Sequence, residues 1–193
     1  MALRSKRAKP RRRSVDVAAL RCELGRARAR IKALAARAEE DPLTGLMNRR
    51  GFARAYARAL AYVRRYGATA ALFFLDLDGF KRVNDRHGHA VGDVVLRRLG
   101  RLLATHVRAA DVIARVGGDE FAILMWNLGE ADAHRRAKAL EALVAGTRFS
   151  ASRIAVRIGA SIGLTMLSPD DKLAAALARA DRAMYRRKRE KRA

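Results

Sequence analysis

The sequence predicts an α/β fold in which helices flank a mixed β-sheet, with one further helix preceding it. Three observations indicate this class. Residues 68–75 form a nearly unbroken apolar run, which is typical of a central strand buried on both faces. Residues 112–116 and 121–125 are two further apolar segments around a glycine-containing turn, and they predict a β-hairpin. Segments with helical spacing of apolar residues separate these strands, so helices are expected to cover the sheet.

The first forty residues divide into two parts. Residues 1–13 contain seven basic residues, one proline and little apolar content, so we expect a basic disordered arm. Residues 14–40 predict a helix, because apolar residues recur three and four positions apart. These residues are Val17, Leu20, Leu24, Ala27, Ile31, Leu34 and Ala38. We expect this heptad seam to form a parallel coiled coil in a homodimer; the alternative is an amphipathic helix that packs on its own domain.

The following elements are predicted from helix caps and breakers. Asp41-Pro42 ends the first helix, since proline disfavours helical geometry in the residue before it. Asn48 is expected to cap a helix that Gly67 stops. After the apolar strand, residues 79–90 form a loop or a short helix. Asp93 is expected to begin the next helix, because a carboxylate is favourable at the positive end of a helix.

The C-terminal half continues the alternation of helices and strands. A helix is predicted over residues 130–145. Residues 154–158 alternate apolar and polar side chains, so we expect one half-buried strand that runs on toward Leu167. A final helix is predicted over residues 171–190.

Length and composition exclude several classes of protein. A chain of 193 residues with 50% hydrophobic composition can bury one good core and carry an appendage. No apolar run approaches the roughly 20 residues of a membrane helix. Cys22 is the only cysteine, which excludes an intramolecular disulfide and a cysteine-based zinc site. His87 and His89 do not have the spacing of zinc ligands. We therefore expect a cytoplasmic protein without a transmembrane segment.

The formal net charge of +23 is extreme, and basic residues are concentrated at both ends of the chain. Such ends bind polyanions without specificity, through phosphate contacts. No aromatic residues alternate with the basic ones, so we expect no specific nucleic-acid partner.

Carboxylates gather at two predicted strand ends. The hairpin tip contains Asp119 and Glu120 beside two glycines, which allow a bulky anion to approach the backbone. Asp76 ends the buried strand. Oxygen ligands of this kind suit a hard cation, and Mg²⁺ sites use one or two carboxylates together with substrate phosphates. The set predicts metal-assisted phosphoryl or nucleotidyl transfer; the alternative is a solvated acidic turn.

The hairpin motif Gly117–Phe121 resembles the signature of GGDEF-domain diguanylate cyclases, and four more segments of the chain resemble motifs of that family, all in the expected order. The first motif is Asp41–Leu46 followed by Asn48–Arg50. The second is Asp76–Lys81, which continues through Asn84-Asp85, Gly88-His89 and Gly92-Asp93. The last two motifs are Ser161–Gly163 and Ala180–Tyr185. The resemblance covers residues 41–193, which we expect to form the catalytic GGDEF domain. It implies the palm-like sheet of nucleotide cyclases and polymerases.

The resemblance implies a role for each matching residue. Asp76, Asp119 and the Leu77 carbonyl match the ligands of Mg²⁺, with two ions per active site and Mn²⁺ as a possible substitute. Glu120 matches the acid that assists deprotonation of the ribose 3′-hydroxyl, although metal-bound water is an alternative base. Lys81 joins Asp119 and Glu120 in the catalytic set.

Further positions match the contacts to GTP. Asn84 and Asp93 match the pair that reads guanine, whose N1 and N2 hydrogens an aspartate accepts. His89 is expected to approach the same pocket. The remaining matches, which meet the triphosphate through backbone amides or positive charge, are Gly79, Phe80, Lys81, Lys188 and Arg192. Two positions depart from the family pattern: Gly79 replaces a larger residue, and Lys191 stands where a glycine usually precedes the arginine.

Arg108 and Asp111 form an Arg-x-x-Asp motif before the hairpin, and this motif resembles the family's product-binding inhibitory site. The alternative is a helix-end arginine with a turn aspartate. The resemblance implies a homodimeric diguanylate cyclase that condenses two GTP into cyclic di-GMP and two pyrophosphates. Three alternatives remain open at this point: an idle GGDEF domain that acts as a cyclic di-GMP receptor, a nucleic-acid-binding protein, and a cyclase that makes a different dinucleotide.

Overall fold

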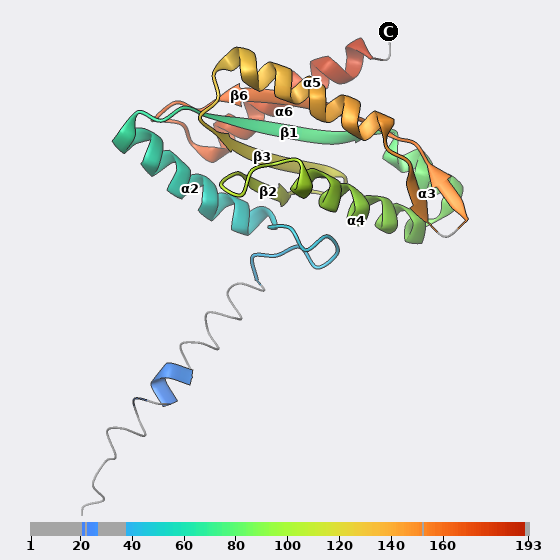
Figure 1. The fold of residues 1–193 in the computed structure, drawn as a ribbon, viewed down its shortest axis with the longest axis horizontal. Coiled ribbons are helices and arrows are strands. Elements are labelled where there is room, and N and C mark those ends of the chain that lie inside the picture. Colours follow the sequence, from blue (N-terminus) through green and yellow to red (C-terminus); the bar gives the residue numbers. More distant parts are fainter. Residues whose placement is uncertain (1–20, 22, 27–37, 152, 192–193) are drawn as a thin grey trace, which may run out of the picture. The chain divides into compact units, whose positions relative to one another are not determined.

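The apolar run predicted to lie at the centre of the sheet is strand β1 (Ala70–Asp78) in the computed structural model. β1 pairs antiparallel with β3 (Glu120–Trp126) on one side and with β6 (Gly159–Met166) on the other. β2 (Val112–Arg115) pairs with the outer edge of β3, so the strand order is β2-β3-β1-β6 (Figure 1). A parallel bridge between Met47 and Ala114 adds to these antiparallel pairs. The predicted class, a mixed sheet flanked by helices, is confirmed.

The structure describes residues 21, 23–26, 38–151 and 153–191. Residues 1–37 and 38–193 form two units. In the first unit, residue 21 and residues 23–26 are helical. The predicted basic arm, most of the heptad seam and Arg192 lie outside the described residues. None of the described helices is long and apolar enough to cross a membrane.

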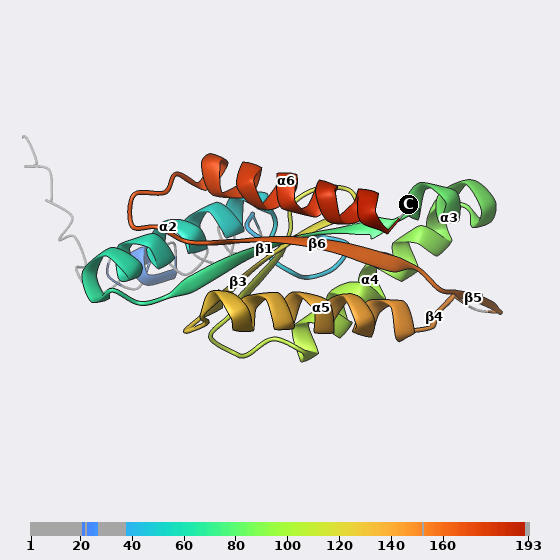
Figure 2. The same ribbon diagram turned by 90° about the horizontal axis from the view of Figure 1, so that it is seen from above.

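Helices cover both faces of the sheet (Figure 2). Helices α4 (His89–Thr105) and α5 (Glu130–Gly146) pack on the face that contains Phe73 and Leu75. Helices α2 (Arg49–Tyr66) and α6 (Leu173–Glu190) pack on the opposite face, which contains Leu72 and Phe74. Because side chains alternate along a strand, consecutive residues of β1 enter two separate cores. This explains why the run is apolar without interruption.

The caps of α2 are as predicted, but α4 begins earlier than predicted. The Asn48 side chain accepts hydrogen bonds from the backbone N–H groups of Arg50 and Gly51, and Gly67 ends the helix with a φ of 63°. The segment after β1 is a short helix, α3 (Phe80–His87). The prediction that Asp93 begins the next helix is wrong. Gly88, with a φ of 80°, makes the turn between α3 and α4 by itself, so α4 already starts at the following residue.

The strand predicted to start at Ile154 is two strands. Residues Ile154–Val156 form β5, which pairs with β4 (Phe149–Ala151) in a separate two-stranded sheet. β6 of the main sheet begins only at Gly159. Alternation of polar and apolar residues indicates which face of a strand is buried, but it does not indicate the partner strand, so the break at residues 157–158 was not visible.

Gly163 allows α6 to approach β6 closely. A Cβ atom at this position would overlap the Ala180 carbonyl oxygen and the Met184 amide nitrogen of the helix backbone. We expect Gly163→Ala to lower the free energy of unfolding by about 1–3 kcal/mol, because α6 must shift to relieve the overlap. Urea unfolding measures the change. Gly146→Ala is the matched control, since a Cβ at the end of α5 meets no atom within 4 Å; equal midpoints for both variants would contradict this close packing.

Candidate active site

Three carboxylates meet where β1 ends and the β2–β3 hairpin turns. Asp76 and Glu120 lie directly opposite each other in the antiparallel ladder, and Asp119 precedes Glu120 at the tip of the hairpin. Opposite residues of such a ladder project from the same face of the sheet. Gly117 leaves room at the tip, because a Cβ there would overlap the Glu120 carboxylate. The hairpin therefore brings together acids that are more than forty positions apart in the chain.

Burial and mutual repulsion raise the pKa of two of these acids. For Asp76, burial has the largest effect; the charges of Asp119 and Asp78 raise the pKa further, while the hydrogen bond from Lys188 opposes the rise. The Lys188 ammonium group contacts Asp76 Oδ1. Burial also raises the pKa of Glu120, as do the charges of Asp76, Asp119 and Asp181, and Arg49 partly offsets these effects. The site therefore contains more negative charge than its lysine neutralises.

This donor set fits a hard divalent cation. Asp76 and Asp119 supply carboxylate oxygens, and a bound cation would relieve the repulsion that raises the two pKa values. The Leu77 side chain is apolar and buried, so Leu77 could contribute a ligand only through its backbone carbonyl. Among the described residues, no group of three or more His, Cys, Asp and Glu side chains is placed so that it could hold a metal ion by itself. Mg²⁺ suits such an open set, because it retains positions for substrate phosphates.

A pocket of about 460 Å³ adjoins the carboxylates on the α3–α4 side of the sheet. It brings together six of the residues that the sequence predicted for the site: Phe80, Lys81, Asn84, His89, Asp93 and Asp119. Asn84 Oδ1 is buried there without a hydrogen-bond partner. Gly92 makes room for this amide, because a Cβ atom at that position would overlap Asn84 Oδ1. A buried polar atom without a partner is costly, and a ligand with a complementary donor would satisfy it.

Other predicted residues lie at the edges of this pocket or apart from it. Gly79 adopts a φ of 79° as the N-cap of α3, with no side-chain cap, so the first amides of α3 are available to an anion. Lys188 reaches the carboxylates from α6, on the opposite face of the sheet. Arg108 and Asp111 lie in the loop between α4 and β2, outside the residues that line the pocket.

Arg115 and Asp41 form a link to the hairpin tip that sequence reasoning missed. The Arg115 guanidinium donates to the Gly118 carbonyl at 2.8 and 3.0 Å and to both oxygens of Asp41 at 3.1 and 3.2 Å. Asp41 also accepts from the Thr44 amide and hydroxyl. Burial raises the pKa of Asp41, but the bonds from Thr44 and Arg115 outweigh this and lower it overall. Arg115 and Asp41 are 74 positions apart in the chain. One sign in the sequence indicated a role for Asp41, its place in the motif Asp41–Leu46, and no sign indicated its partner.

The raised pKa of Glu120 leads to a prediction for the metal-free protein. Because the folded-state pKa is raised, Glu120 stays protonated to a higher pH than an ordinary glutamate, whose pKa is about 4.3. We expect Asp181→Asn to lower this pKa, since it removes one nearby negative charge, and added Mg²⁺ to lower it as well. Carboxyl carbon NMR measures the titration, in EDTA for the parent and Asp181→Asn and in excess Mg²⁺ without EDTA for the second comparison. Glu120→Gln supplies the assignment. An unchanged midpoint in both cases would contradict the electrostatic description of the site.

A sheet that ends in clustered acids beside a pocket with an unsatisfied amide has the groups that a metal-dependent nucleotide-binding domain requires. A family model described as "Diguanylate cyclase, GGDEF domain" matches residues 38–193. This chain belongs to the GGDEF domain family.

Two curated relatives illustrate the similarity. Diguanylate cyclase TpbB of Pseudomonas aeruginosa is 38% identical over 183 residues, which are 92% of this chain and 42% of TpbB. The probable diguanylate cyclase DgcE of Escherichia coli (strain K12) is 37% identical over 156 residues, which are 80% of this chain and 14% of DgcE. The chain thus spans less than half the length of either relative.

Solved structures agree with the fold. The coiled coil and GGDEF domain of DgcB from Caulobacter crescentus, in complex with c-di-GMP, has a TM-score of 0.81 and 28% identity, with 90% of this chain and 93% of that chain covered. The isolated GGDEF domain of TpbB has a TM-score of 0.73 and 38% identity, with 78% and 89% covered.

Proposed function

We propose that this chain is a diguanylate cyclase, which condenses two GTP molecules into cyclic di-GMP and releases two pyrophosphates. The observation that carries the proposal is that Asp119 lines the pocket that contains Asn84 and Asp93, while the next residue, Glu120, lies opposite Asp76 in the ladder. The acids suit phosphate chemistry with a divalent cation, and the pocket offers hydrogen-bond groups complementary to guanine. An intact carboxylate set does not favour the alternative of an idle receptor.

The proposed roles of the residues follow from their positions. Asn84 and Asp93 bind the guanine edge, and His89 lies beside them. The first amides of α3, after Gly79, and the lysine side chains bind the triphosphate; these lysines are Lys81 and Lys188, with Arg192 as a further predicted contact.

Asp76, Asp119 and the Leu77 carbonyl would hold Mg²⁺, for which we propose two ions, with Mn²⁺ as a substitute. The bound cation would neutralise charge that develops on the transferring phosphate.

Glu120 is proposed to accept the proton of the ribose 3′-hydroxyl. The 3′-oxygen then bonds to the α-phosphorus of the other GTP, and pyrophosphate leaves with the electron pair of the broken P–O bond. A base with a pKa raised toward the working pH is suited to this proton transfer.

A homodimer is required by this reaction, because each domain presents one GTP and each 3′-hydroxyl must face the other α-phosphate. We propose that the heptad seam of residues 14–40 pairs two chains. Leu24, a seam residue that the structure describes, is 51% exposed in the single chain, as a coiled-coil residue without its partner would be. The similar DgcB structure comprises a coiled coil together with its GGDEF domain.

Incubation of the purified chain with GTP and Mg²⁺, followed by chromatography of the nucleotides, tests the function. We expect cyclic di-GMP and pyrophosphate from GTP and no cyclic dinucleotide from ATP. Absence of product at every protein concentration, with cyclic di-GMP still bound, would identify a receptor and overturn the proposal. Binding only to nucleic acid, with a steep salt dependence, would favour the polyanion-binding alternative.

Product inhibition through Arg108 is a further part of the proposal. The Asp111 carboxylate accepts hydrogen bonds from the backbone amides of Arg108 and Trp126, at 2.9 and 3.2 Å, and so holds the loop in shape. Arg108 forms no ion pair among the described residues, and its guanidinium suits phosphate or guanine.

We expect Arg108→Ala to raise the cyclic di-GMP concentration for half-maximal inhibition at least about tenfold, as the loss of one charged contact of about 1.5–3 kcal/mol implies. The initial rate without product should stay near that of the parent. Initial rates at increasing added cyclic di-GMP measure the effect, and Arg101→Ala on the exposed surface of α4 is the control. Unchanged inhibition would place the product site elsewhere.

A further inference from the structure

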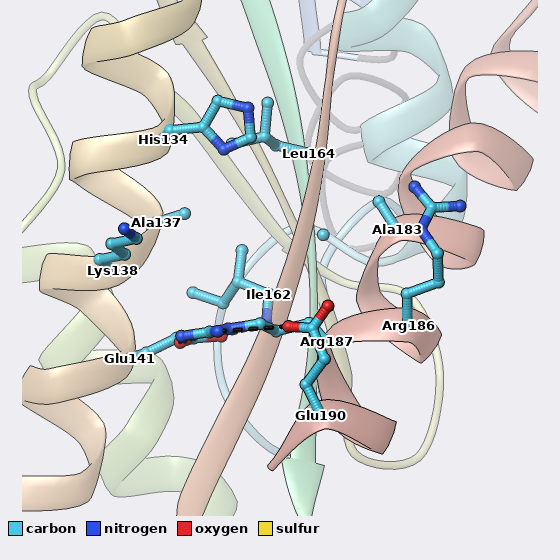
Figure 3. Close-up of a pocket in the computed structure, with 11 residues that line it drawn as sticks. His134, Ala137, Lys138, Glu141, Ile162, Leu164, Ala183, Arg186, Arg187 and Glu190 are labelled. Atoms are coloured by element: carbon cyan, nitrogen blue, oxygen red, sulfur yellow. Dashed lines mark hydrogen bonds and ion pairs between the residues drawn. The ribbon is translucent and has the colours of Figure 1, made fainter.

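Glu141 on α5 is a buried carboxylate that the proposed reaction does not use (Figure 3). Only 7% of its surface is exposed. Its Oε1 atom accepts the backbone N–H of Ile162 at 2.9 Å and lies 3.0 Å from Lys191 Nζ, while its Oε2 atom accepts from Arg187 Nη2 at 3.2 Å and Nε at 3.3 Å. A buried charge is tolerated when it is paired and fully hydrogen-bonded, as Glu141 is here.

The Glu141 contacts connect the two helical layers around the edge of the sheet. α5 and α6 lie on opposite faces, and β6 is the edge strand between them (Figure 2). Glu141 binds the edge amide of Ile162, Arg187 of α6 and Lys191, the C-cap of α6. Lys191 Nζ also donates to the Ala160 carbonyl at 2.6 Å. Side chains therefore satisfy backbone groups of this edge and at the same time hold α6 against it.

The turn of α6 that Glu141 contacts, through Arg187, is also the turn that carries Lys188. Arg187 and Lys191 flank Lys188, and the Lys188 ammonium contacts Asp76 in the carboxylate site. Lys191 Nζ also lies 3.9 Å from Asp78, the last residue of β1 before the Gly79 turn. The last turn of a helix has few hydrogen-bond partners of its own and frays unless other groups hold it.

We infer that Glu141 is a positioning residue: through Arg187 and Lys191 it holds the last turn of α6 so that Lys188 stays at Asp76. The inference rests on the proposed function only where its test measures turnover of GTP.

A double-mutant cycle with Lys188→Met tests the inference. Glu141→Gln keeps an acceptor for the Ile162 amide but loses the charge that faces Arg187 and Lys191. We expect it to lower kcat/KM for GTP about tenfold, because a small displacement of a group that contacts the site is costly for catalysis. In the Lys188→Met background the same change should have little further effect, because the residue through which it acts is gone. Glu190→Gln is the matched control, since Glu190 makes only an exposed pair with Arg187.

Hydrogen–deuterium exchange without nucleotide supplies a second readout that does not depend on activity. Amides of residues 187–191 should exchange faster in Glu141→Gln than in the parent, while the first turn of α6 should be unchanged. Lys191→Met is the second variant if Glu141→Gln does not fold, and it should show the same faster exchange. Lys191→Arg keeps the positive charge beside Glu141 and should exchange like the parent.

Equal losses of kcat/KM in both backgrounds, or unchanged exchange at residues 187–191, would overturn the positioning role. A parent chain that makes no cyclic di-GMP would overturn the proposed function, and the exchange measurement would then decide the positioning of the turn by itself.

Discussion

Glu120→Gln is expected to lower kcat for cyclic di-GMP formation by about 10²–10⁴-fold, the usual contribution of a general base. Glutamine has nearly the volume of glutamate but cannot accept the proton of the 3′-hydroxyl. KM for GTP should change less than twofold, because Glu120 does not line the pocket in which Asn84 and Asp93 are proposed to bind guanine. Initial rates and calorimetric binding of a non-hydrolysable GTP analogue separate the two effects.

The fold should tolerate this change. The ladder contacts of Glu120 with Asp76 and its carbonyl bond from the Val116 amide are backbone interactions, which the substitution keeps. Removing one of several clustered negative charges also relieves repulsion. Glu130→Gln on α5 is the control for the loss of a surface carboxylate. Turnover near the parental rate in Glu120→Gln would mean that another group, such as a bound water, takes the proton.

Asp76→Asn is expected to lower kcat/KM about a thousandfold, because a cation that stabilises a transferring phosphate contributes several kcal/mol and Asp76 is a proposed ligand. The Mg²⁺ concentration for half-maximal activity should rise as well, since an amide oxygen carries no charge. In addition, Lys188 loses the carboxylate that it contacts. Initial rates measured over a range of GTP concentrations, at each of several Mg²⁺ concentrations, give both quantities.

Two control measurements test whether the effect of Asp76→Asn is specific to metal binding. Asp132→Asn removes an exposed acid of α5 and should leave the Mg²⁺ dependence unchanged. Thermal unfolding should give similar midpoints for Asp76→Asn and the parent in EDTA, because Asp76 pairs with β3 and β6 through its backbone. Parental Mg²⁺ dependence in Asp76→Asn would remove this residue from the proposed ligand set.

Much of the candidate site was visible in the sequence because its parts are local. The apolar run of β1, the Asn48 cap and the Gly67 stop each depend on a few neighbouring residues, and each prediction is confirmed. The pocket unites Asn84 from α3, Asp93 from the second turn of α4 and Asp119 from the tip of the predicted hairpin. The start of α4 was missed, since one glycine with positive φ turned the chain where several residues seemed necessary.

The sequence by itself determined the class of fold, the hairpin with its acids and the chemistry available at the strand ends, because hydrophobic period and turn residues act over short distances. Only the tertiary structure decided which distant groups meet. Arg115 joins Asp41 across 74 positions, and Arg187 joins Glu141 across 46. Such pairs leave no periodic signal, because charged residues are abundant in this chain and the topology alone selects which of them come within hydrogen-bond distance.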